Sequence, residues 1–172
     1  MAARGITLSD GVLVLDRLRP EDMEAHLAGE DEEQARRFGW WPRRSGPHQF
    51  RALLAADERD WDEGGPRRRF AARAGGILVG GCELRLRGGG RAEASYWTFP
   101  EFRSRGYATR ALRLLAEWAF PKQRILRVEL HVEPDNAASL AVAARAGFAP
   151  TGRRTSEGLL VYARGCAKRP SR

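Results

Sequence analysis

The chain has 172 residues, of which 42% are hydrophobic and five are tryptophan, so it can bury a core and is too apolar for a disordered chain. Its formal net charge of +8 favours anionic partners, namely a phosphorylated cofactor, an acidic peptide or nucleic acid, unless it only reflects a genome rich in G and C. Nucleic acid is not expected, because the arginines are scattered and no zinc-finger spacing or aromatic RNA-binding motif accompanies them.

The sequence shows no sign of membrane, secretion or metal chemistry. No apolar run approaches the ~20 residues of a membrane span, and the opening segment MAARGITLSDG lacks the apolar core of a secretion signal. Cys82 and Cys166 are far apart and fit no metal-binding or redox spacing. We therefore expect a cytoplasmic protein without a metal or a membrane partner, as a monomer or homodimer.

The first half of the chain predicts one strand, then helices, then three strands. The segment VLVLDRLRPEDMEAHLAG indicates a strand, a turn at Pro20 and a helix. Residues 30–66 contain at least one amphipathic helix, because hydrophobic residues recur at helical spacing in HQFRALLAADERDW. Over residues 67–99, glycine clusters interrupt short apolar runs, which is typical of three antiparallel strands joined by tight turns. No helix follows Gly88–Gly90, so we expect a hairpin turn there and not a phosphate loop.

The second half changes to a helical period. Hydrophobic residues line one face of a predicted helix over about 104–120, which we expect Pro121 to end. The alternating segment RVELHV predicts a half-buried strand, and PDNAASLAVAARAGF predicts a helix capped by Asp135 or Asn136 and followed by Gly147. A last strand is expected over 159–166. The order is then βααβββαβαβ, in a single domain of residues 1–172.

The segment PEFRSRGYATRAL, residues 100–112, places unusual residues where the long helix starts. The first N–H groups of a helix have no internal partner, and the helix dipole puts partial positive charge there. Gly106 lets the backbone approach an anion closely, Arg103 and Arg105 add charge, and Thr109 adds a hydroxyl. This combination between a strand and an amphipathic helix predicts a site for a phosphate group.

The same segment resembles a known motif. RSRGYATRAL is similar to the acetyl-coenzyme-A loop of the GNAT N-acetyltransferases, whose pattern is Gln/Arg-x-x-Gly-x-Gly/Ala, and AEASYWTFPEFRSRGYA resembles the family's fourth strand and loop. VEPDNAASLAVAARAGFAPTGR resembles the family's Asn-x-x-Ser helix with its Gly-Phe ending. The specific match covers about residues 75–155, and it resembles most closely the branch of the ribosomal-protein N-terminal (alanine) acetyltransferases.

The resemblance implies a fold and a cofactor site. The fold would be α/β (α+β), a mostly antiparallel mixed sheet that is flanked by helices and splayed between the family's fourth and fifth strands. Acetyl-CoA would be the co-substrate, its pantetheine arm along the fourth strand and its pyrophosphate on the amides of residues 105–109. Carried over residue by residue, the cofactor-binding residues would be Trp97, Thr98, Phe99, Arg103, Ser104, Arg105, Gly106, Tyr107, Ala108, Thr109, Asn136 and Ser139.

The resemblance also implies an acid and a base. Ser139 would reach the thiol sulfur and protonate the leaving thiolate, and Tyr162 is an alternative phenol acid. Attack by an amine requires loss of a proton to a base or a water relay. Glu129, near the splay point, is the first choice and Glu93 the second; the residues that share the strand face of Glu129 are His131 and Glu133. Either carboxylate could instead be solvated or paired with arginine.

Several functions stay open at this stage. The first is an N-acetyltransferase acting on a primary amine, either a protein N-terminus or a small molecule such as an antibiotic or polyamine. A polyamine would need carboxylates such as those in EDMEAHLAGEDEEQ, which could also be a solvated helix start. A non-catalytic acyl-CoA-binding sensor is the alternative in another class. Three tryptophans could shape the acceptor pocket or pack against the sheet: Trp40, Trp41 and Trp61.

Overall fold

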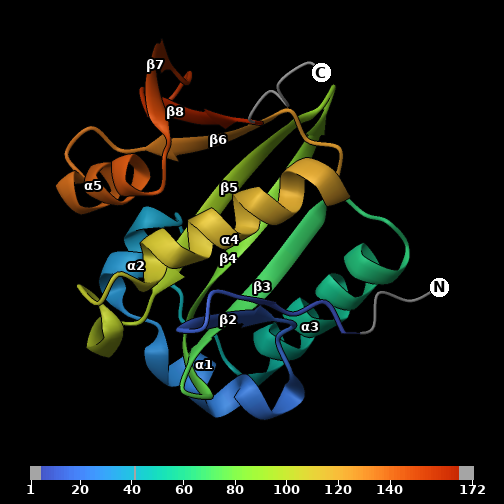
Figure 1. The fold of residues 1–172 in the computed structure, drawn as a ribbon. Helices are drawn as coiled ribbons and strands as arrows, with labels where there is room; N and C mark the ends of the chain where they lie inside the picture. The colour runs from blue at the N-terminus through green and yellow to red at the C-terminus, as the bar shows by residue number, and fades with distance from the viewer. Residues whose placement is uncertain (1–4, 41, 167–172) are drawn as a thin grey trace.

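A computed structural model describes residues 5–40 and 42–166, which form one eight-stranded sheet with helices on both faces (Figure 1). The strands, in the spatial order β1-β2-β3-β4-β5-β6-β8-β7, are β1 (Leu8–Ser9), β2 (Leu13–Asp16), β3 (Arg67–Ala74), β4 (Ile77–Gly88), β5 (Arg91–Thr98), β6 (Arg127–Val132), β7 (Ala149–Arg154) and β8 (Leu160–Gly165). The helices are η1 (Pro20–Asp22), α1 (Met23–Gly29), α2 (Glu32–Arg37), α3 (Pro47–Asp62), η2 (Pro100–Phe102), α4 (Tyr107–Lys122) and α5 (Ala137–Arg145). The mixed α/β fold with a mostly antiparallel sheet confirms the predicted fold class.

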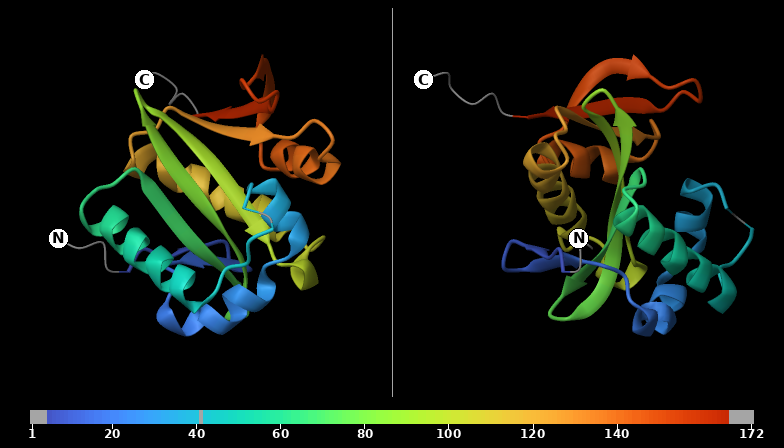
Figure 2. Two further views of the ribbon diagram at one scale, coloured as in Figure 1. Left: turned by 180° about the vertical axis from the view of Figure 1, so that it is seen from behind. Right: turned by 90° about the vertical axis from the view of Figure 1, so that its right-hand side faces the viewer.

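The helices form two layers around the sheet. Helix α4 covers one face, and α1, α2 and α3 lie on the other, as the two further views show (Figure 2). Strands β1 to β5 are all paired antiparallel, while β5 and β6 form the single parallel pair among the described residues. The crossover between these parallel strands is α4, which the helical period of the sequence predicts.

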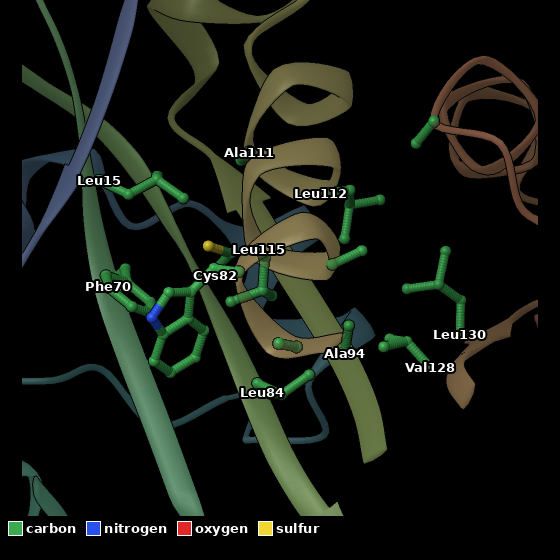
Figure 3. Close-up of a cluster of buried hydrophobic side chains, with 14 of the residues drawn as sticks. Leu15, Phe70, Cys82, Leu84, Ala94, Ala111, Leu112, Leu115, Val128 and Leu130 are labelled. Carbon is green, nitrogen blue, oxygen red and sulfur yellow. The ribbon is translucent and has the colours of Figure 1, made fainter. Parts of the chain in front are cut away.

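The main core lies between α4 and the sheet. Leu112 and Leu115 of α4 are fully buried against Phe70 and Leu84 of the central strands (Figure 3). Strand β6 alternates as predicted, because its apolar residues Val128, Leu130 and Val132 are buried and the residues between them are not. The period of two in RVELHV therefore turns one face of β6 to the core and the other to a polar side of the sheet.

The sheet opens between β5 and β6. Their parallel ladder holds only at Arg91–Arg127, Ala92–Val128 and Glu93–Glu129, although β5 continues to Thr98 and β6 to Val132. Beyond Glu93 and Glu129 the two strands separate, which leaves the facing edges of both strands without a neighbouring strand. The splay expected from the resemblance is therefore present at this point.

A buried ion cluster holds the first helical turn against the sheet. Arg73 of β3 donates to Asp16 of β2 at 2.9 Å and to Asp22 of η1 at 2.7 Å. All three side chains are buried, so the pairing compensates for the water that each charge loses. Burial acts to raise the pKa of Asp22, but the hydrogen bonds from Arg73 and from a backbone amide lower it overall.

The bounds of α4 and three additional elements differ from the prediction. Helix α4 begins at Tyr107 and not at residue 104, and it continues through Pro121 to Lys122. Proline costs a helix one backbone hydrogen bond and a clash with the preceding turn. Here it lies in the last turn, and the amide of Gln123 still donates to the carbonyl of Ala119 at 3.0 Å. Two edge strands, β1 and β7, and a third helix before β3 were not predicted; these elements are short or lack periodicity.

Candidate active site

A cavity of about 940 Å³ lies at the gap between β5 and β6. Its walls come from the open ends of both strands, the start of α4, the first turns of α5, and α2. Side chains alternate along β5, so Ala94 and Tyr96 face the α4 side of the sheet while Glu93, Ser95 and Trp97 face the other side. The cavity is therefore reached by different side chains on the two faces of the sheet.

The start of α4 has the geometry of an anion site. Gly106 is the N-cap residue with φ of +80°, and a β-carbon there would meet nothing within 4 Å. Ser104 also has a positive φ of 61°. The first intrahelical bond of the helix goes from Arg110 to the carbonyl of Gly106, at 3.2 Å. The amides of residues 107–109 are therefore without helical acceptors at the cavity wall, which fits the pyrophosphate of acetyl-CoA.

The two arginines of the loop have other partners. Arg103 donates to the carbonyl of Thr98 at 3.1 Å and pairs with Asp31 at 2.8 Å and Glu33 at 3.0 Å. Arg105 lies over the ring of Phe102, 5.5 Å from its centroid. Arg103 therefore ties the loop to α2, and the backbone amides are the groups left to meet a phosphate.

The structure brings most of the predicted site residues to the cavity. The predicted residues that line it are Glu93, Trp97, Thr98, Arg103, Ser104, Gly106, Tyr107, Ala108, Thr109, Asn136 and Ser139. Four other candidates do not line it: Phe99, Arg105, Glu129 and Tyr162.

Phe99 and Tyr162 are directed to the interior. Phe99 is 2% exposed, and its amide donates to the carbonyl of Val79 at 2.9 Å instead of facing the gap. Its ring lies so close to Gly29 of α1 that a β-carbon on Gly29 would be 2.4 Å away. Tyr162 is paired with Leu130 and packs against the main core.

A hydrogen bond joins the two sides of the cavity on the α4 face. The hydroxyls of Tyr96 and Ser139 are 2.7 Å apart, although the residues come from β5 and α5. Asn136 caps α5, because its Oδ1 accepts from the amide of Ser139 at 3.1 Å. Burial raises the pKa of the Tyr96 phenol, while its hydrogen bond with Ser139 acts in the opposite direction. A phenol kept protonated at neutral pH can donate a proton to Ser139.

Tyr96 was missed as a functional residue, because the sequence offered packing in the core as a sufficient reason for an aromatic residue there. The available signal was its position on the strand that leads into the loop, on the same face as the predicted Asn-x-x-Ser helix. Only the contact with Ser139, 43 positions away, gives the phenol a role.

The opposite face of the gap carries ionisable side chains. His131 lies between Glu93 and Glu129, with Nδ1 3.5 Å from Glu93 Oε1 and Nε2 4.0 Å from Glu129 Oε2. His131 and Glu93 line the cavity. Glu129 is instead held by Arg127 and Arg153 at its other oxygen.

Helix α2 is fixed over this side of the cavity by ion pairs from two directions. Arg37 pairs with Glu133 at the end of β6, and Arg103 pairs with Asp31 and Glu33. These contacts hold a wall of the cavity between the α4 loop and β6. The acidic segment before α2 is therefore paired with arginine in part, and not simply solvated.

The tryptophans of the first half have different positions. Trp61 packs into the core, with its ring 5.2 Å from that of Phe70 and 6.0 Å from that of Trp118. Trp40 does not line the cavity, and Trp41 lies outside the described residues. Packing is therefore the observed role for Trp61.

Neither a metal group nor a membrane helix is found in the described part of the chain. No set of three or more His, Cys, Asp or Glu side chains in residues 5–40 and 42–166 is arranged to hold a metal ion. Within the same ranges, no helix is long and apolar enough to cross a membrane.

Comparison with known structures agrees with this geometry. RimJ of Mycobacterium smegmatis, solved with CoA-disulfide, is 21% identical with a TM-score of 0.80, covering 99% of this chain and 92% of that one. A putative ribosomal-protein-serine acetyltransferase of Vibrio cholerae is 18% identical with a TM-score of 0.75, covering 96% and 100%. The microcin C7 self-immunity acetyltransferase MccE, solved with acetyl-CoA and AMP, is 16% identical with a TM-score of 0.76, covering 91% and 94%.

These similarities show the fold, and a sequence model shows the family. No curated protein sequence matches the chain significantly. The model of the acetyltransferase (GNAT) domain matches residues 13–149, which include the splayed strands, the α4 loop and the Asn-x-x-Ser helix. The chain therefore belongs to the GNAT acetyltransferases, the acetyl-CoA-dependent acyltransferases that the loop and helix motifs resemble.

Proposed function

We propose that the protein transfers an acetyl group from acetyl-CoA to a primary amine that enters on the α2 side of the sheet. One observation carries the proposal. A single cavity joins the hydroxyl pair of Tyr96 and Ser139 on one face with Glu93 and His131 on the other, through the gap between β5 and β6. Formation of an amide from an ammonium and a thioester needs one group that accepts a proton from the amine and another that supplies a proton to the leaving thiolate.

The cofactor side of the cavity consists of groups suited to a phosphorylated thioester. When bound, acetyl-CoA supplies an activated acetyl group. The amides of residues 107–109 would hold its pyrophosphate, the free edge of β5 its pantetheine arm, and Asn136 would contact that arm as well. Ser139, bonded to Tyr96, is placed to deliver a proton to the cavity on this face.

The amine side carries the base. Of the two carboxylates predicted from the sequence, Glu93 lines the cavity, and Glu129, its direct partner in the strand ladder, does not. We propose that the negative charge of this pair attracts the acceptor ammonium to this side of the cavity. Because nearby negative charge stabilises the protonated form of an amine, a separate base has to accept its proton. Both carboxylates are also bound by arginines, so they contribute charge without being free bases.

The acceptor class follows from the charges on α2. A polyamine requires several unpaired carboxylates, but Asp31 and Glu33 are paired with Arg103, and Glu133 with Arg37. A single amine, such as a protein N-terminus or a small monoamine, fits better. A protein acceptor is compatible with the fold shared with the putative ribosomal-protein-serine acetyltransferase. A non-catalytic acyl-CoA-binding sensor would have no use for the hydrogen bond between the hydroxyls of Tyr96 and Ser139.

An acceptor screen tests this function. Purified protein is mixed with acetyl-CoA and a panel of C-terminally amidated tetrapeptides with free N-termini, together with spermidine, and free thiol is measured. Release of thiol with a peptide, and acetylation of its α-amine by mass spectrometry, would support the proposal. Tight acetyl-CoA binding without transfer to any amine would favour the sensor instead. One domain, a cytoplasmic location and a monomeric or homodimeric state stay predictions from the sequence.

A further inference from the structure

His131 occupies the first position on the polar face of β6 beyond the end of the strand ladder. The last paired residues of β5 and β6 are Glu93 and Glu129, and His131 follows two residues later on the same face. Its side chain is 27% exposed and lines the cavity. The imidazole therefore lies where the gap opens, nearer to the cavity than Glu129.

The two carboxylates beside His131 are each held on one oxygen. Glu129 Oε1 accepts from Arg127 Nε at 2.8 Å and also from Arg153, while Oε2 faces the imidazole. Glu93 Oε2 accepts from Arg87 Nε at 3.1 Å, while Oε1 faces the imidazole at 3.5 Å. Each carboxylate thus joins an arginine to the imidazole.

This arrangement favours the imidazole over the carboxylates as the base. Each carboxylate accepts hydrogen bonds from arginine on one oxygen and faces the imidazole with the other, so neither has an oxygen free for the proton of the substrate. A free imidazole titrates near pH ~6.5 and free carboxylates near ~4, and general bases work best near the operating pH. Other charged groups also lie around the imidazole. Glu157, in the exposed loop between β7 and β8, interacts with His131. Arg85 of β4, the strand partner of Glu93, and Glu133 line the same cavity.

We propose that His131 accepts the proton of the acceptor ammonium, and that Glu93 and Glu129 are positioning residues; this rests on the proposed acetyl transfer. The shorter approach of Nδ1 to Glu93 favours a proton on Nδ1, which leaves Nε2 as the acceptor. The ammonium loses one proton to Nε2, the neutral amine nitrogen bonds to the acetyl carbon, and the carbon–sulfur bond breaks as the sulfur takes a proton from Ser139. The nitrogen then loses its second surplus proton, which returns through water to the hydroxyl pair of Ser139 and Tyr96. The imidazolium, held between two carboxylates, then releases its proton to water.

The first test replaces the imidazole. His131→Ala should lower kcat by ~10²-fold or more toward the best peptide of the acceptor screen, while acetyl-CoA affinity measured by calorimetry stays unchanged. Added imidazole should restore part of the lost rate, because the side chain borders an open cavity. His48→Ala, at an exposed site on α3, is the matched control and should keep full activity.

The carboxylate variants separate positioning from base catalysis. Glu93→Gln and Glu129→Gln keep the shape and remove the charge, so each should lower kcat less than His131→Ala and shift the acid limb of the pH profile. Neither variant should be rescued by imidazole. If Glu93 or Glu129 were the base, its glutamine variant would lose more of kcat than His131→Ala does.

A binding measurement tests the site without turnover. The NMR resonances of the His131 imidazole are assigned by their absence from the spectrum of His131→Ala. In the complex with CoA, which cannot transfer acetyl, the same peptide should shift these resonances. The resonances of the other histidines should not move.

Full activity of His131→Ala, or a lost rate that imidazole does not restore, overturns the role of His131 while wild-type turnover still upholds acetyl transfer. A wild-type protein inactive toward every amine refutes the proposed function itself.

Discussion

Replacing Gly106 by aspartate would place a carboxylate at the start of α4, at the wall of the cavity. Gly106 has φ of +80°, and a β-carbon there points into space where nothing lies within 4 Å. Any side chain in this left-handed conformation costs about 1–2 kcal/mol of stability. Gly106→Ala carries the same backbone cost without a charge, so it is the matched control.

The difference between the two variants isolates the charge. Two like charges ~4 Å apart at an effective dielectric of ~20 repel by about 4 kcal/mol, and a pyrophosphate presents more than one negative charge. We therefore expect Gly106→Asp to bind acetyl-CoA at least ~10³-fold more weakly than Gly106→Ala. Gly106→Ala itself should lose much less, because the helix amides stay in place.

Calorimetry with acetyl-CoA measures both affinities, and thermal unfolding checks that both variants fold. Gly106→Asp should melt no lower than Gly106→Ala, because both carry a side chain in the left-handed conformation and aspartate can also cap the start of the helix. If Gly106→Asp is folded and binds acetyl-CoA within about tenfold of Gly106→Ala, the pyrophosphate does not lie at this loop. Two folded variants with very different affinities would support the assignment.

Ser139→Ala should lower kcat by ~10²-fold or more with little change in acetyl-CoA affinity, and steady-state kinetics that show only a higher KM would assign it to binding alone. Tyr96→Phe removes only the hydroxyl bonded to Ser139 and should lower kcat by less than Ser139→Ala does. If the two losses in activation free energy simply add in the double variant, the two hydroxyls do not act together. Arg73 lowers the pKa of Asp22, so stability present at neutral pH should be lost as the pH falls below about 4. Between pH 7 and pH 3, the melting temperature should fall less steeply in Asp22→Asn than in the wild type. Equal slopes of melting temperature against pH in the two proteins would contradict this. Phe70→Ala removes a fully buried ring and should cost about 3–5 kcal/mol in urea unfolding; a loss below about 1 kcal/mol would mean that the core refills the space.

Local signals in the sequence were sufficient for several elements. The period of two in RVELHV gave β6 and its buried face, and the helical period gave α4 and α5. The loop before α4, which we predict to bind the pyrophosphate, is visible in the sequence because its features are neighbours there: a glycine, the first amides of a helix, and a preceding strand. Asn136 caps α5 through Ser139, as a residue three positions away can.

Contacts between distant segments were beyond that reach. Tyr96 meets Ser139 because the strands separate after Glu93 and Glu129, and no local pattern marks where a ladder ends. His131 shares a strand face with Glu129, but its place at the cavity depends on β5 as its neighbour. Short-range periodicity and caps in the sequence therefore determine the long, regular elements, while β1, β7 and the short helix α2 carry no such signal. The choice of proton donor and acceptor depends on long-range pairing, because it requires side chains from separate elements to meet in one cavity.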